Sequence, residues 1–156
     1  MDYYIIRFED EKIARYAIWY TDDKDGFVCE NGHIRFFTSE EALKAYADAK
    51  SISLHDEVYL FDIGRMKQLL SAEFANFDCT EILNFWNMIS DALRSMGKKF
   101  SGDGEDERIN RIYDKLFHGA DIPAHHTGKR LVWTKEELDL IKKVLLQYTC
   151  FWDGIL

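Results

Sequence analysis

The sequence predicts an α+β fold, in which an N-terminal antiparallel β-meander is followed by C-terminal helices packed on one face. Alternating, aromatic and β-branched stretches are concentrated in the first 37 residues, whereas apolar residues at three- and four-residue steps dominate the later part. Strands early and helices late are typical of helices packed against an antiparallel sheet. No repeat or low-complexity linker divides the chain, so residues 1–156 are expected to form a single domain.

Three stretches make up the predicted meander. Residues 3–8 alternate, which places Tyr4, Ile6 and Phe8 on one face of a strand. Residues 13–20, IARYAIWY, are aromatic and β-branched enough for a second strand. Asn31-Gly32 lies between FVCE and HIRFF and predicts a hairpin, because both turn positions of such a hairpin need positive φ. A further strand is expected within 52–62, around VYLFDI.

The stretch from Asp78 to Met96 predicts the central helix of the core. Its apolar residues fall on one helical face, which is expected to be buried. Asp78 and Glu81 have the spacing of a capping box, in which each side chain accepts an N–H of the other's backbone. The opposite face carries Asn84, Asn87, Asp91 and Arg94, and is expected to be simply solvated.

Shorter helices are predicted on both sides of the central one. Capping-box spacing recurs at Thr38 with Glu41 and at Thr134 with Glu137. Gly102 and Gly104 lie among acids and predict a mobile loop over 98–107. The residues 120–132 are expected to form an extended loop and the apolar tail to dock on the core. The other expected helices span 39–50, 65–73, 109–119 and 134–148.

Charge is unevenly distributed along the chain. The net charge is −8, and residues 1–64 carry nearly all of the excess acid. An acidic surface repels phosphate backbones and anionic lipid but attracts cationic partners, so we expect neither nucleic-acid nor membrane binding. No stretch approaches the roughly 18 apolar residues of a membrane span. The three cysteines are far apart and no basic leader precedes an apolar run, which together predict reduced thiols and a cytoplasmic location.

Common catalytic and metal-binding motifs are missing from the sequence. His125 and His126 are adjacent and so do not share a helix face as zinc-binding histidines do. The acidic stretch before Gly26 lacks the ligand positions of a calcium loop. No phosphate-binding glycine loop or nucleophile elbow occurs. We therefore expect no cofactor, no metal and no catalytic residue, although three cysteines and five histidines leave a pairing in space open.

The general make-up resembles the bacterial immunity proteins of polymorphic and contact-dependent toxin systems. The stretches HIRFFTSEEALKAYA, NFWNMISDA and YDKLFHGADIPA carry this resemblance, together with the acidic composition and the missing motifs. The resemblance implies a non-enzymatic protein that binds and neutralises a toxin domain, such as a nuclease.

Acidic side chains are the predicted partner-binding residues. A nuclease attracts phosphate through its positive charge, and acidic side chains can compete with phosphate for it. Trp19 and Trp152 are expected to act as aromatic anchors. Solvated charged loops, a regulatory or structural module that binds through an apolar groove, and an enzyme without a familiar motif remain alternatives. The acidic residues form two clusters, Asp22, Asp23, Asp25 and Glu30 in the first and Asp103, Glu105, Asp106 and Glu107 in the second.

Overall fold

The structure is a computed structural model that describes residues 1–71, 77–120 and 131–153, with side chains described as far as Leu146. Pro123 and the histidine doublet His125-His126 lie outside the described residues, as do residues 154–156 and the side chains of the apolar tail, including Cys150 and Trp152. Within the described part, no helix combines the length and the apolar character that crossing a membrane requires.

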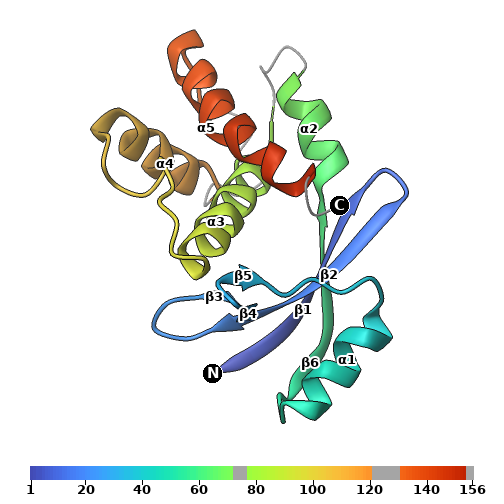
Figure 1. Cartoon of the computed structure of the whole chain (residues 1–156). Helices are drawn as coiled ribbons and strands as arrows, with labels where there is room; N and C mark the ends of the chain where they lie inside the picture. Colours follow the sequence, from blue (N-terminus) through green and yellow to red (C-terminus); the bar gives the residue numbers. More distant parts are fainter. Residues whose placement is uncertain (72–76, 121–130, 154–156) are drawn as a thin grey trace.

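The predicted α+β fold is confirmed: a mostly antiparallel sheet comes first and helices follow (Figure 1). The main sheet has the order β3-β2-β1-β6. Strands β1 (Asp2–Asp10) and β2 (Ile13–Thr21) form a nine-residue antiparallel hairpin, and β3 (Gly26–Phe27) extends it on the β2 side. Strand β6 (Leu54–Asp62) lies on the other side of β1 and runs parallel to it.

The Asn31-Gly32 turn is confirmed, since both residues have positive φ, at 52° and 79°. The hairpin is shorter than the sequence indicates, because β4 (Cys29–Glu30) and β5 (His33–Ile34) pair as a separate two-stranded sheet. The chain leaves the main sheet after Phe27, yet the N–H of Val28 still donates to the carbonyl of Ile18.

The two faces of the main sheet carry two different apolar clusters, as the alternation in β1 predicts. Ile6 and Phe8 belong to the larger cluster, with α2 (Ile63–Ser71) and α3 (Cys79–Ser95). Ile5 points to the opposite face and packs with Leu43 of α1 (Glu40–Ala49). The C-terminal helices thus lie on one face, and α1 covers part of the other.

Helix α3 is the central helix, as predicted. Its apolar face is buried, with Trp86 at 1% exposure. Helices α4 (Glu107–Ala120) and α5 (Lys135–Asp153) complete the helical layer beside it. Among the side chains described, those that these two helices bury are Ile109, Ile112, Leu116, Ile141, Val144 and Leu145.

Helix caps follow the sequence signals in part. The predicted box at Thr134 and Glu137 is confirmed in both directions, at 3.2 Å and 3.0 Å. The first helix is capped by Ser39 rather than Thr38, with the N–H of Ala42 donating to its hydroxyl. At α3, Asp78 accepts from the N–H of Thr80.

Candidate functional site

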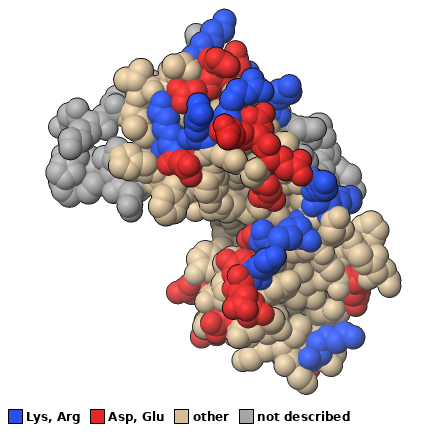
Figure 2. Space-filling model, turned by 90° about the vertical axis from the view of Figure 1, so that its left-hand side faces the viewer, with Lys and Arg blue, Asp and Glu red and all other residues tan. Residues whose placement is uncertain are grey.

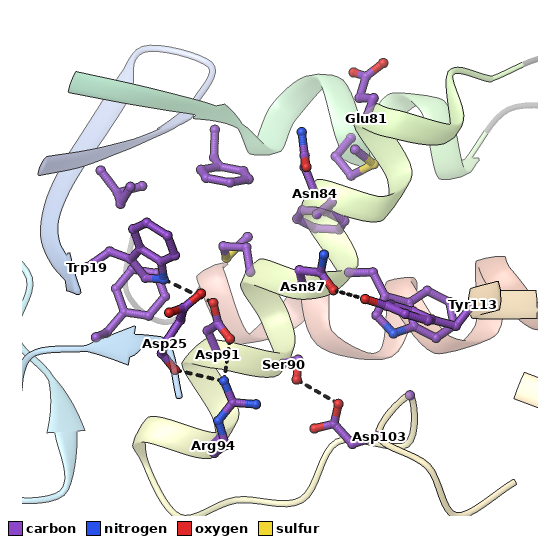
Figure 3. A pocket seen from close by; sticks show the side chains of 18 of the residues that line it. Trp19, Asp25, Glu81, Asn84, Asn87, Ser90, Asp91, Arg94, Asp103 and Tyr113 are labelled. Atoms are coloured by element: carbon purple, nitrogen blue, oxygen red, sulfur yellow. Dashed lines mark hydrogen bonds and ion pairs between the residues drawn. The ribbon is translucent and has the colours of Figure 1, made fainter. Parts of the chain in front are cut away.

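A large cleft lies between the main sheet and the helical layer, with α3 along one side (Figure 3). Its volume is about 1210 Å³, which exceeds the roughly 300–1,000 Å³ of ordinary small-molecule sites. Residues of β2, β6, α3, α4 and the loop before α4 line it. The space is therefore large enough for several side chains of a macromolecular partner.

The polar face of α3 makes one wall of this cleft. Asn84 and Arg94 are exposed, as predicted, but the prediction of a simply solvated face is wrong for Asn87 and Asp91. Asn87 accepts a hydrogen bond from the hydroxyl of Tyr113, at 2.8 Å. Asp91 is half-buried and bonded on both carboxylate oxygens. The helical periodicity places these residues correctly on one face, but it cannot show that the sheet and α4 fold over that face.

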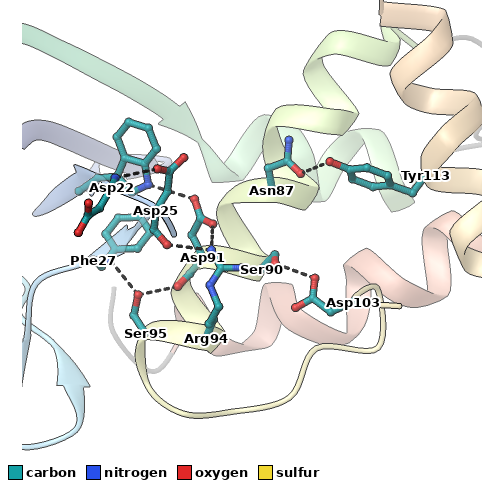
Figure 4. A network of polar contacts seen from close by, with 11 residues as sticks. Asp22, Asp25, Phe27, Asn87, Ser90, Asp91, Arg94, Ser95, Asp103 and Tyr113 are labelled. Atoms are coloured by element: carbon teal, nitrogen blue, oxygen red, sulfur yellow. Dashed lines mark hydrogen bonds and ion pairs between the residues drawn. The ribbon is translucent and has the colours of Figure 1, made fainter. Parts of the chain in front are cut away.

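Asp91 joins the helix to the sheet (Figure 4). The indole N–H of Trp19 donates to its Oδ2 at 3.1 Å, and Arg94 Nη2 donates to its Oδ1 at 2.6 Å. Arg94 also donates to the carbonyl of Asp25, at 2.8 Å. Burial raises the pKa of Asp91 above its ordinary value, while the hydrogen bond from Trp19 and the charge of Arg94 partly oppose that rise.

Ser95 makes a second link between α3 and the sheet. The buried N–H of Phe27 donates to its hydroxyl at 2.8 Å, and the hydroxyl donates to the carbonyl of Asp91 at 2.7 Å. The preceding Gly26 permits this close approach, because a Cβ there would lie 2.7 Å from the Ser95 hydroxyl oxygen. The short β3 is therefore held against the end of α3.

The loop over 98–107, which the sequence predicts to be mobile, packs on α3. Phe100 is buried against the indole of Trp86. Asp103 Oδ1 accepts a hydrogen bond of 2.7 Å from Ser90, the one buried polar residue among the described ones. These contacts bring Asp103 to the edge of the cleft opposite Asp25 (Figure 3).

The structure brings one member of each predicted acidic cluster to the cleft, namely Asp25 and Asp103. The other members lie outside the lining residues. Asp22 and Asp23 are exposed in the turn before β3. The remaining acids pair with nearby basic side chains, which are Arg35 for Glu30, Lys99 for Glu105, Arg108 for Asp106 and Arg111 for Glu107.

Sequence reasoning missed four cleft carboxylates. Among the lining residues, six carry a carboxylate and one, Arg94, carries a basic group. Arg94 is paired with Asp91, and Glu81 is paired with Arg65, which lies outside the lining. The other four carboxylates have no ion pair among the described residues. The positions of these residues in the sequence do not indicate that they line the same cleft. The missed carboxylates are Asp62, Glu81, Asp91 and Asp114.

The cleft also has an aromatic part beside β6. The ring of Tyr4 lies 5.7 Å from that of Trp19 and 5.7 Å from that of Tyr59. Trp19 and Tyr59 line the cleft, as the prediction of Trp19 as an anchor requires. Aromatic faces next to carboxylates are suited to Lys and Arg side chains, through cation–π contact and ion pairing.

The described residues contain no group of three or more His, Cys, Asp and Glu arranged to hold a metal ion. Cys29 and Cys79 are free thiols, and burial raises the pKa of both, which favours the unreactive protonated form. No His or Cys occurs among the described residues that line the cleft.

Figure 2 shows the molecule from one side, with an indentation between its upper and lower parts. Acidic side chains gather on the lower part, near this indentation, whereas both signs of charge are mixed on the upper part. The acidic character is therefore local and does not cover the whole of this face.

Comparisons with known proteins give one distant structural neighbour. No protein-family model matches the sequence, and no curated protein sequence matches it. The crystal structure of the SatS C-terminal domain in complex with bromine is similar with a TM-score of 0.41 and 18% identity, over 93% of this chain and 91% of that one.

Proposed function

We propose that the protein is an immunity protein, which binds and neutralises a cationic toxin domain, such as a nuclease, through its acidic cleft. The observation that carries the proposal is the charge of the lining, which holds six carboxylate residues and one arginine. Arg94 pairs with Asp91 and Arg65, outside the lining, pairs with Glu81, which leaves four carboxylates without an ion pair among the described residues. A nuclease attracts phosphate with Lys and Arg, and an acidic cleft can compete for the same side chains.

Two further features support this proposal. The cleft exceeds the size of an ordinary small-molecule site, which suits a protein partner. Its aromatic residues, Trp19 and Tyr59, lie beside the carboxylates, and aromatic anchors are enriched where binding energy is concentrated in protein interfaces. The same cleft therefore offers both fast electrostatic association and a desolvated contact.

The experiment begins with a pull-down from the source organism at low and at high salt, followed by identification of the retained proteins. We expect a single basic protein, retained less well at high salt because screening weakens charge steering. The purified partner should then lose its toxic activity at a one-to-one ratio with this protein. An acidic partner, or a basic partner whose activity persists in the complex, would contradict the proposal.

A matched pair of double variants separates the effect of the cleft carboxylates on affinity from the effect of the net charge of the protein. Asp103→Lys with Asp114→Lys reverses two cleft carboxylates, and Asp23→Lys with Glu105→Lys makes the same change in formal charge outside the cleft. We expect the cleft variant to bind the partner at least about tenfold more weakly, and the control to change affinity less than about threefold. Equal effects would show that the cleft has no special role.

The alternatives give different results in these measurements. A module that binds through apolar contacts would retain its partner at high salt and tolerate both double variants. An enzyme would act on a substrate without a stoichiometric partner.

A further inference from the structure

Strand β6 is an open edge of the main sheet. The sheet order β3-β2-β1-β6 places it at the end, and β1 is the one strand that pairs with it among the described residues. The opposite edge is better covered, because β3 and a bridge from Phe37 to Tyr16 both lie against β2. A nine-residue edge thus presents unpaired backbone groups to any extended segment that approaches.

The side chains of this edge are unusually apolar for an exposed strand. Val58, Tyr59 and Leu60 are 41%, 43% and 57% exposed, and they follow one another in the middle of β6. Natural edge strands usually carry lysine, proline or a bulge, which discourage pairing with other chains. The strand β6 contains neither lysine nor proline, and the register irregularity in its pairing with β1 lies between Leu54 and Val58, before the exposed centre. Its exposed centre is therefore suited to pairing.

Charge argues against a second copy of this chain as the occupant. The strand carries Asp56, Glu57 and Asp62 and no Lys or Arg. Two copies of β6 side by side would bring six carboxylates together without a cation, and like charges across paired strands are destabilising. A segment that carries Lys or Arg would instead gain from the same carboxylates.

The edge is continuous with the acidic cleft. Tyr59 and Phe61 of β6 line the cleft, and the register pairs them with Ile6 and Phe8 of the helical face. Alternate positions of an added strand would therefore face the cleft. Side chains on the other face would meet Val58 and Leu60.

We propose that an extended, basic segment of a protein partner adds to the sheet beside β6, as a fifth strand. Alternate side chains of that segment would be basic towards the cleft, where Tyr59 lies with its hydroxyl bonded to Glu57, and apolar towards Val58 and Leu60. Main-chain hydrogen bonds would supply affinity and the side-chain alternation would supply specificity. This inference rests on the proposed function, since it states how the cationic partner is held.

A short peptide tests the mode of binding without the natural partner. The probe is an eight-residue peptide of alternating Arg and Val, blocked at both ends. Two further versions carry backbone N-methyl groups, one on all Arg residues and the other on all Val residues. Because the N–H groups of alternate residues point to the same edge of a strand, each version lacks the hydrogen-bond donors of one edge of the peptide. A fourth peptide has Glu in place of Arg. Binding is followed by NMR titration of the isotope-labelled full chain and by amide exchange.

We expect the Arg-Val peptide to bind and to slow exchange of alternate amides within 56–61. One of the two N-methylated versions should bind at least about tenfold more weakly, because it loses several hydrogen bonds at once. The Glu version should not bind. Val58→Lys should weaken binding, whereas Ile13→Lys, at a comparable exposure of 44% on β2, should not.

Three results would overturn the inference. Equal binding of all Arg peptides, with shifts in the cleft alone, would refute strand addition and leave the acidic cleft intact as the partner site. No binding of the Arg-Val peptide would also refute strand addition, and the pull-down would then decide the proposed function separately. A dimer of this chain formed through β6 would replace the basic partner with a second copy.

Discussion

Replacing Asp91 with alanine removes the carboxylate that ties α3 to the sheet. Its bond with Trp19 joins two half-buried groups, and hydrogen bonds to charged groups contribute about 1.5–3 kcal/mol. The exposed Arg94 adds at most about 1 kcal/mol. The substitution also removes the free-energy cost of burying the carboxylate, which offsets part of this loss. We therefore expect a net destabilisation of about 2 kcal/mol.

Urea unfolding followed by circular dichroism measures this loss, and a double-mutant cycle isolates the contact. For a chain of this length, about 2 kcal/mol corresponds to a melting temperature lower by about 4–8 °C. A cycle of Asp91→Ala with Trp19→Phe should show a coupling of about 1–2 kcal/mol. Glu81→Ala is the control, since Glu81 lines the same cleft but pairs with an exposed Arg65 and should cost less than about 1 kcal/mol.

The result that would refute this reasoning is a coupling below about 0.3 kcal/mol, since contacting residues couple more strongly than that. A pH series adds an independent check with Asp91→Asn. The pKa of Asp91 is raised in the folded protein, so the folded state holds this proton more tightly than the unfolded chain. The wild type should therefore gain stability relative to the Asn variant as the pH falls through the folded-state pKa. An opposite trend would show that the ion pair with Arg94 outweighs burial.

Two other substitutions test local features of the fold. Thr134→Ala removes the hydroxyl that caps α5 and should lower the free energy of unfolding by about 0.5–2 kcal/mol, whereas Thr134→Ser should be nearly neutral. Equal losses would exclude the cap as the cause. Gly26→Ala places a Cβ 2.6 Å from the Tyr20 hydroxyl and should cost about 1–3 kcal/mol in urea unfolding. An unchanged midpoint would mean that the side chains of Tyr20 and Ser95 move aside at no cost.

Local signals in the sequence predict local structure well. The Asn31-Gly32 turn and the box of Thr134 with Glu137 each depend on residues a few positions apart, and both occur as expected. The central helix follows from its periodicity for the same reason. Such features could be predicted where no distant group competes for the residues involved.

The cleft could not be predicted, because it depends on contacts between distant parts of the chain. Trp19 and Asp91 are 72 positions apart, and no periodicity links them. Strand β6 is recognisable as a strand, but its parallel pairing with β1 depends on the crossover through α1. Glu81 has capping-box spacing, yet its carboxylate binds Arg65 instead. Competition between partners of similar strength is settled by tertiary packing.

The junction between β6 and α2 has a consequence for the kinetics of recognition. The strand ends at Asp62 and the helix begins at Ile63, and the carboxylate of Asp62 accepts the N–H of Arg65 in the first turn. The hydrogen bonds from Trp19 to Asp91 and from Phe27 to Ser95 also join the sheet to α3, so side-chain contacts hold the two walls of the cleft together. A partner would meet a site that is already shaped, so association would require little conformational ordering of this protein and its rate would be set by diffusion and charge.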